Sequence, residues 1–227
     1  MAADASASRP RILYSDAGPE PPYPLCMEGV VIAGFGRGSK ELGIPTANLP
    51  VDAGATPWIA SAKSGVYFGY AAVALPAGHP DRPASPRAAA AVREEDESSP
   101  SGRVSPTVAP PSPPPPPPPG TAWQIYPMVM SIGYNPFYKN AVRSAEVHVL
   151  HAFAADFYGA PLRLLLLGFV RDERDYASLD ALVRDINVDC DVARQSLARP
   201  AWSPREGAVG GAPGVVGTFD GSWLVRD

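Results

Sequence analysis

Proline is distributed very unevenly along this chain, and this limits how much of the chain can fold. Of the 29 prolines, 15 lie between Pro76 and Pro119, and seven of them are consecutive from Pro113 to Pro119. The same segment carries the acidic run Glu94 to Glu97. Such a composition buries too little apolar surface to offset its ordering entropy. We therefore expect a disordered, polyproline II-like insertion at about 76–122.

The two ends of the chain are expected to add little to a folded core. Residues 1–23 lack an apolar run and are predicted to be a disordered N-terminal segment. Residues 201–227 are rich in Gly, Ala and Pro and are predicted to form a flexible tail. What remains is one domain over 24–200, interrupted by the insertion. Its roughly 130 core residues are the usual size of one compact domain.

Charge and cysteine content exclude several classes of protein. The net charge is −4, and the sequence has no stripe of Lys and Arg that could follow the phosphates of a nucleic acid, so nucleic acid is not expected as the main partner. The longest apolar run, 162–170, is far shorter than the roughly 20 residues of a membrane span. Cys26 and Cys190 are the only cysteines and form no Cys-x-x-Cys pair, which favours a reducing compartment. We expect a cytoplasmic monomer, with an organelle left open because the N-terminal residues are a weak transit signal.

Short apolar segments separated by turn residues predict a mainly β fold, either a barrel or a sandwich. If the strand that ends near residue 75 and the strand that begins near 126 are hairpin partners, the insertion is an overgrown turn. Lengthening a loop from roughly 5 to roughly 50 residues costs only about 2 kcal/mol in closure entropy, which a domain can tolerate. The expected strands are 26–32, 65–73, 126–133, 146–153 and 162–170.

Residues 176–197 change to helical spacing. Apolar residues recur there every three or four positions. Ser178 is a suitable N-cap, and Asp180 is favourable in the first turn. We expect one amphipathic helix packed against the strands. Its predicted apolar face comprises Leu179, Leu182, Val183, Ile186, Cys190, Val192, Ala193 and Leu197.

The segment most suggestive of a ligand is Gly34-Phe-Gly-Arg-Gly-Ser-Lys40. Glycine lets backbone N–H groups curl around an anion. The side chains of Arg37 and Lys40 would neutralise part of the charge of a polyphosphate. The order of Gly38, Ser39 and Lys40 does not fit a P-loop, and the glycine spacing does not fit a dinucleotide fingerprint. The segment therefore indicates a phosphate-binding loop of another type.

Thr46 and Asn48 follow this loop and are two residues apart. On an extended segment both side chains point to the same side. A hydroxyl and an amide carbonyl are hard oxygen ligands that suit Mg²⁺, which keeps its other positions for water and phosphate. The alternative is a rigid Pro-Thr-Ala-Asn turn with a capping asparagine, but the adjacent glycine loop favours the metal interpretation.

Glu146 begins an otherwise apolar strand and shares a face with His148. A carboxylate in that setting is a candidate general base. His148 and His151 would face opposite sides with no third ligand near them, so a zinc site is not expected. A structural histidine is the favoured interpretation of His148.

Two further segments allow both a functional and a structural interpretation. The charged loop at 171–176 would by itself be a solvated turn. The aromatic turn at 132–140 could form the wall of a site for a flat ring, but it could equally plug one end of a barrel.

Taken together and in order, these segments resemble the eukaryotic-type riboflavin kinases. The matching motifs are the glycine loop, Pro-Thr-Ala-Asn, Ser-Ile-Gly-x-Asn-Pro-x-Tyr and Glu-x-His-x-x-His-x-Phe. They continue into Asp-Phe-Tyr-Gly, Arg-x-x-x-x-Tyr and a Ser-Leu-x-x-Leu helix. The proline-rich insertion is the main departure. The resemblance implies a six-stranded antiparallel Greek-key barrel that binds ATP–Mg²⁺ and riboflavin on opposite sides of the reacting hydroxyl.

The resemblance also implies a role for individual residues. The phosphates would be contacted by Gly34, Lys40, Thr46 and Asn48, of which Thr46 and Asn48 would also serve the metal. Glu146 would be the catalytic base. The nucleotide site would be lined by Val149, His151 and Tyr158, and the flavin side by Arg171, Arg174 and Tyr176.

The expected activity is that of an ATP:riboflavin 5′-phosphotransferase, with riboflavin and ATP as substrates and FMN and ADP as products. Because the chain lacks room for a second, adenylyl-transferring domain, no FAD is expected. The alternative is a non-catalytic scaffold whose prolines at 113–119 bind SH3 or WW partners.

Overall fold

The computed structural model describes residues 9–33, 43–82, 123–134, 143–206, 209–210 and 216–226. Gly34 and Lys40 of the glycine loop lie outside the described residues, as do the proline-rich insertion from residue 83 onward and the aromatic turn beyond Tyr134. Expectations about those parts stay predictions.

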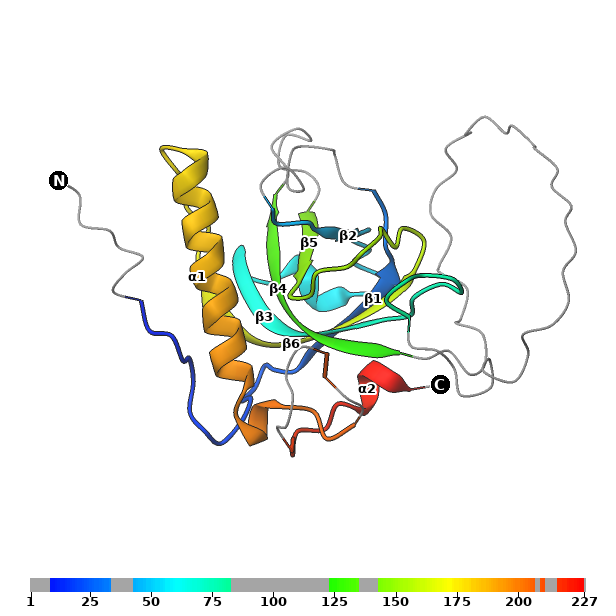
Figure 1. The fold of residues 1–227 in the computed structure, drawn as a ribbon. Helices are drawn as coiled ribbons and strands as arrows, with labels where there is room; N and C mark the ends of the chain where they lie inside the picture. Colours follow the sequence, from blue (N-terminus) through cyan, green and yellow to red (C-terminus); the bar gives the residue numbers. More distant parts are fainter. Residues whose placement is uncertain are drawn as a thin grey trace, which may run out of the picture.

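Six antiparallel strands form one curled sheet in the order β1-β6-β3-β4-β5-β2 (Figure 1). Its two ends approach each other just after β1, where the N–H of Ile32 donates to the carbonyl of Asn48 at 2.9 Å. The expected mainly β fold of six antiparallel strands is confirmed. The strands are β1 Leu25–Val30, β2 Ala47–Leu49, β3 Gly65–Val73, β4 Gln124–Tyr134, β5 Arg143–Val149 and β6 Pro161–Arg171.

The insertion joins two strands that are hairpin partners, which is the condition for it to be an overgrown turn. β3 and β4 pair from Gly65 opposite Ile132 to Val73 opposite Gln124. The connection from β3 to β4 therefore begins and ends at a regular antiparallel ladder, which explains how the sheet accommodates so long a connection.

Alternation along the strands produces two apolar clusters, one on each face of the sheet. The inner cluster is enclosed by the curl, since both edge strands contribute to it through residues such as Met27 and Leu49. The outer cluster, with Phe68 and Val129 among its members, is covered by the long helix and by the C-terminal residues. Residues of one strand thus alternate between a closed interior and a face on which other segments assemble.

The helix α1 covers Leu179–Leu197, and the Ser178 side chain accepts a hydrogen bond from the N–H of Ala181, as expected for its N-cap. The predicted apolar face is only half right. Its second half packs into the outer cluster, but Leu179 is 64 % exposed, whereas Asp185 and Asp189 are each only 1 % exposed. Ion pairs made by Asp185 and Asp189 hold this part of the helix against the rest of the domain.

The chain ends differ from expectation wherever the structure describes them. Residues 9–16 lie against α1 instead of standing apart from the domain (Figure 1). In the tail, Trp202 of the 3-10 helix η4 (Pro200–Trp202) and Leu224 of α2 (Ser222–Val225) are fully buried in the outer cluster. A second 3-10 helix, η1, spans Pro57–Ala60. None of the helices in the described ranges is long and apolar enough to cross a membrane.

Candidate functional site

Three polar residues lie side by side across neighbouring strands, and we call them the polar strip. Glu146 of β5 is directly opposite Asn48 of β2 on one side and Ser131 of β4 on the other. All three side chains are half-buried. Their chain neighbours, such as Ala145 and Val147, point into the inner cluster. The strip therefore lies on the outer face of the sheet.

Register alone produces this arrangement. Antiparallel pairing holds directly opposed residues about 4.5–5.5 Å apart at Cβ. A carboxylate is thus held between an amide and a hydroxyl with little freedom to move away. Glu146 can accept a proton there, and Asn48 and Ser131 offer side-chain oxygen atoms that can accept hydrogen bonds or bind a cation. Ser131 was not singled out from the sequence, although its motif was recognised.

His148 ties the Thr46 segment to the polar strip. Its Nδ1 lies 2.8 Å from the carbonyl oxygen of Pro45, so Nδ1 carries the proton and donates it. Burial lowers the pKa of His148, and the charge of Arg194 acts in the same direction, while the hydrogen bond to Pro45 opposes them. The imidazole is therefore neutral near pH 7 and holds the half-buried Thr46 segment beside β5. This agrees with the structural role expected for His148.

The three residues expected on the nucleotide side have different settings. The Val149 side chain is buried in the inner cluster, on the face opposite the polar strip. His151 stacks on Tyr126, with ring centroids 4.6 Å apart, and Tyr158 is 55 % exposed. Their contact with a nucleotide remains a prediction. Because the Val149 side chain is buried, only the main-chain atoms of Val149 could make such a contact.

Two residues assigned to the insertion belong to the packed part of the molecule. The Asp81 carboxylate accepts a hydrogen bond from the N–H of Ala154 at 2.8 Å. His79 accepts at Nδ1 from the N–H of Asp81, which leaves Nε2 to donate to the carbonyl of Ala155 at 3.1 Å. Both residues thus hold the loop that carries His151. Residues 76–82, which were expected to belong to the insertion, are therefore described as part of the domain.

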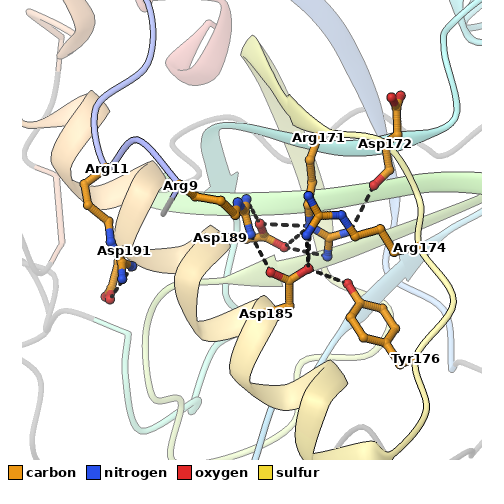
Figure 2. Close-up of polar contacts among 9 residues, drawn as sticks. All are labelled: Arg9, Arg11, Arg171, Asp172, Arg174, Tyr176, Asp185, Asp189 and Asp191. Atoms are coloured by element: carbon orange, nitrogen blue, oxygen red, sulfur yellow. Dashed lines mark hydrogen bonds and ion pairs between the residues drawn. The ribbon is translucent and has the colours of Figure 1, made fainter. Parts of the chain in front are cut away.

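The three residues expected on the flavin side meet two aspartates of α1 (Figure 2). Arg171 donates from Nε and Nη2 to Oδ2 of Asp189 at 3.0 and 2.8 Å. The hydroxyl of Tyr176 donates to Asp185 at 2.6 Å, and Arg174 reaches the same carboxylate at 3.3 Å. We call these residues, together with Arg9, the arginine–aspartate cluster.

The electrostatics of the cluster keep Asp185 charged and Tyr176 neutral. Burial acts to raise the pKa of Asp185, but the hydrogen bond from Tyr176 and the charges of Arg171 and Arg9 outweigh it, so the pKa is lowered. Burial raises the pKa of Tyr176 to about 12, and its hydrogen bond to Asp185 contributes in the same direction. Asp185 is therefore ionised and Tyr176 neutral at physiological pH.

The alternative of a solvated turn at 171–176 is wrong for Arg171, whose side chain is 8 % exposed, whereas that of Arg174 is 40 % exposed. Sequence reasoning missed Asp185 and Asp189. Their signal was present, since residues four apart share one helix face, but they lie among the apolar positions that were taken for the packing face.

The cluster and the polar strip are neighbours. Gly133 is two residues from Ser131 on β4 and therefore on the same face. A Cβ atom at Gly133 would overlap the carboxylate of Glu173, so the 171–176 loop lies directly over this part of the sheet. A ligand seated between the loop and the sheet would thus be within reach of both groups.

A metal held mainly by protein carboxylates, imidazoles or thiolates has no support in the described ranges, where no group of three or more His, Cys, Asp or Glu residues is placed to bind one. Thr46 and Asn48 offer a different donor set, of neutral oxygens at the edge of the strip. Such donors suit Mg²⁺ that takes its remaining ligands from water and phosphate.

Comparison with known proteins points to one family. The family model for riboflavin kinase (flavokinase) matches residues 21–197. A riboflavin kinase of Pyricularia oryzae is 54 % identical over 97 % of this chain and 96 % of that protein, and one of Chaetomium globosum is 52 % identical over 96 % and 94 %. The crystal structure of riboflavin kinase from Trypanosoma brucei covers 80 % of this chain and 84 % of that chain, with a TM-score of 0.48 and 25 % identity.

Proposed function

This chain belongs to the riboflavin kinase family, and we propose that it transfers the γ-phosphate of ATP to the 5′-hydroxyl of riboflavin at the polar strip, giving FMN and ADP. The observation that carries the assignment to the strip is the register that sets Glu146 between Asn48 and Ser131. A base must be held firmly against the hydroxyl that it deprotonates. Two flanking strands provide that rigidity.

In this proposal Glu146 orients and deprotonates the 5′-hydroxyl of riboflavin. Phosphoryl transfer depends chiefly on positioning and charge neutralisation, because the transition state involves little covalent chemistry with the protein. Ser131 lies beside the carboxylate and is placed to orient the ribityl chain. Riboflavin would approach from the outer face, and the apolar side chains that fill the inner face support this.

The nucleotide would lie on the β2 side of the strip. Thr46 and Asn48 would hold the phosphates and Mg²⁺, and Gly34 and Lys40 would contact the phosphates. When bound, Mg²⁺ would offset charge on the transferred phosphoryl group. The protein's own part is positional: His148 fixes the Pro45 carbonyl, and through it the segment that carries Thr46.

Riboflavin would lie on the α1 side, against Arg171, Arg174 and Tyr176. Glu173 above Gly133 indicates that this loop borders the strip. Arg174 is the most exposed arginine of the cluster and has a single 3.3 Å contact, which leaves its guanidinium the most available to a ligand.

The test is to incubate purified protein with riboflavin, ATP and Mg²⁺ and to separate the flavins. FMN formed in step with ADP is the expected result, and no FMN would contradict the proposal. The same assay decides against the scaffold alternative if FMN appears, and a parallel pull-down with SH3 domains measures any binding by the prolines. We propose a monomeric working form, which light scattering after gel filtration would check.

A further inference from the structure

The first described residues of the chain form a strap beside α1. Residues 9–16, which we call the N-terminal strap, run in the same direction as the helix (Figure 1). Because the strap and the helix run parallel, residues further along the strap contact residues further along α1. These contacts pair Arg9 with Asp185 and Asp189, Arg11 with Asp191, and the N–H of Leu13 with Oγ of Ser196.

The strap is anchored at its far end independently of Arg9. The Tyr14 hydroxyl accepts from the N–H of Phe169 at 2.7 Å and donates to its carbonyl at 3.2 Å. Its ring packs against Phe68 and Trp202. The Arg199 guanidinium donates to carbonyls of the strap, including those of Leu13 and Tyr14. The strap therefore joins α1 to β6, two residues before Arg171, and replacing Arg9 leaves this anchor intact.

Arg9 bridges the two aspartates that hold the flavin-side residues (Figure 2). Its Nη1 lies 2.6 Å from Oδ1 of Asp185 and its Nη2 lies 2.5 Å from Oδ1 of Asp189. The second oxygens of the same carboxylates accept from Arg174 at 3.3 Å and from Arg171 at 2.8 Å. Arg9 thus holds Oδ1 of each carboxylate, sharing that of Asp189 with Nε of Arg171 at 3.1 Å, and leaves Oδ2 of each to the flavin-side residues.

Counting charges shows why this matters. Three guanidinium groups, those of Arg9, Arg171 and Arg174, face two carboxylates, which leaves one positive charge in excess. Without Arg9 the charges would balance, and Asp185 would have an oxygen without its present partner. A buried carboxylate that loses a partner is strongly destabilised, so a cation that can reach it would be drawn toward it. Arg174, exposed and held by one long contact, is the cation with most freedom to move.

We propose that Arg9 is a positioning residue for riboflavin binding. By satisfying Oδ1 of both aspartates it keeps Arg174 from being drawn inward and holds Arg171 in its place at the end of β6. This inference rests on the proposed flavin-side role of Arg171, Arg174 and Tyr176. It gives the N-terminal strap, which precedes the residues matched by the family model, a part in substrate binding.

The test compares four variants of the full chain: Arg9→Ala, Arg9→Lys, Arg11→Ala and Arg174→Ala. Arg9→Ala should raise the riboflavin KM about tenfold, the size of one charge-assisted hydrogen bond. Its kcat and its ATP KM should stay within about threefold of the parent values. Arg9→Lys should give an intermediate KM, because an ammonium cannot bridge two carboxylates as a guanidinium does. Arg11→Ala is the matched control, and its riboflavin KM should be unchanged.

The outcomes separate this inference from the proposed function. If Arg174→Ala raises the riboflavin KM and Arg9→Ala does not, the positioning role is overturned and the flavin-side assignment stands. If Arg174→Ala leaves that KM unchanged, the assignment of Arg174 fails and the role of Arg9 fails with it. A lower melting temperature for Arg9→Ala with an unchanged riboflavin KM would make Arg9 a purely structural residue and overturn the proposal.

Discussion

The polar strip and the arginine–aspartate cluster are neighbours on the same face of one sheet, but they are built in opposite ways. The strip takes its geometry from backbone register, which sets Glu146 between Asn48 and Ser131. The cluster takes its geometry from side-chain ion pairs, which join Arg9 near the start of the chain to Asp189 in α1.

Because of this difference, substitutions at the two sites should affect different properties of the protein, either the rate of catalysis or the stability of the fold. A side chain placed by register can be changed without disturbing the ladder that positions it. A side chain inside a buried ion-pair cluster cannot be changed in this way, because its removal leaves a buried partner without its hydrogen bond or its opposite charge. Substitutions in the strip should therefore change catalysis at constant stability, and substitutions in the cluster should change stability first.

The largest effect is expected at the strip. Glu146→Gln keeps the shape of the side chain and removes the base, and loss of a general base typically lowers a rate by about 10²- to 10⁴-fold. We expect kcat to fall in that range while the melting temperature and the KM values stay near those of the parent. Steady-state kinetics beside thermal unfolding would measure this, with exposed Glu20→Gln as the control. A kcat of Glu146→Gln within threefold of the parent value would show that Glu146 is not the catalytic base.

The next largest effect is expected in the cluster. Asp189→Ala removes the carboxylate shared by Arg171 and Arg9, and breaking a buried ion pair costs about 3–5 kcal/mol of unfolding free energy. Chemical denaturation would measure the loss. Asp191→Ala is the matched control, because it lies on the same helix but is 54 % exposed, and it should cost less than about 0.5 kcal/mol. Equal losses for the two variants would show that the cluster adds nothing beyond a surface pair.

A smaller effect is expected at the edge of the strip. Asn48→Ala removes a proposed oxygen ligand of Mg²⁺, and one such contact to a charged group contributes about 1.5 kcal/mol or more, or roughly tenfold in affinity. We expect the Mg²⁺ concentration for half-maximal rate to rise about tenfold at saturating riboflavin. Asn187→Ala, exposed on α1, is the control. An unchanged Mg²⁺ titration in a normally folded Asn48→Ala protein would exclude the metal role of Asn48.

The smallest effect is a pH dependence confined to the cluster. The pKa of Asp185 is lowered in the folded protein because the hydrogen bond from Tyr176 and the nearby arginines outweigh the effect of burial. Its charge therefore stabilises the fold above the unfolded pKa of about 3.9, and this contribution is lost as pH falls through the folded value.

Denaturation of the parent and of Asp185→Asn across pH would check this. The difference in their unfolding free energies should be constant from about pH 6 to 8 and should shrink below about pH 4. A difference that grows on acidification would contradict the assigned sign.

Most of the strands were predictable from the sequence, but β2 was not among the expected ones, and β5 covers Arg143–Val149 instead of 146–153. The register that builds the strip, with Ser131 in it, was not predicted. The β3 limits were predicted residue for residue, and the N-cap at Ser178 was also found. Period-2 alternation correctly separated the face of Glu146 from that of Val147. These features depend on neighbours in the chain or on simple strand pairing, so local patterns carry them.

The sequence by itself thus determined the family, the antiparallel strands and the face on which the candidate base lies, because each follows from local periodicity or a contiguous motif. Only the tertiary structure decided that Asp185 and Asp189 seat the first half of α1 and that Arg9 completes their ion pairs. It alone also decided that His79 and Asp81 belong to the folded domain. The physical reason is that a buried charge is tolerated only where partners converge on it, and these partners lie far apart in a chain whose local pattern predicted an apolar face and a disordered segment.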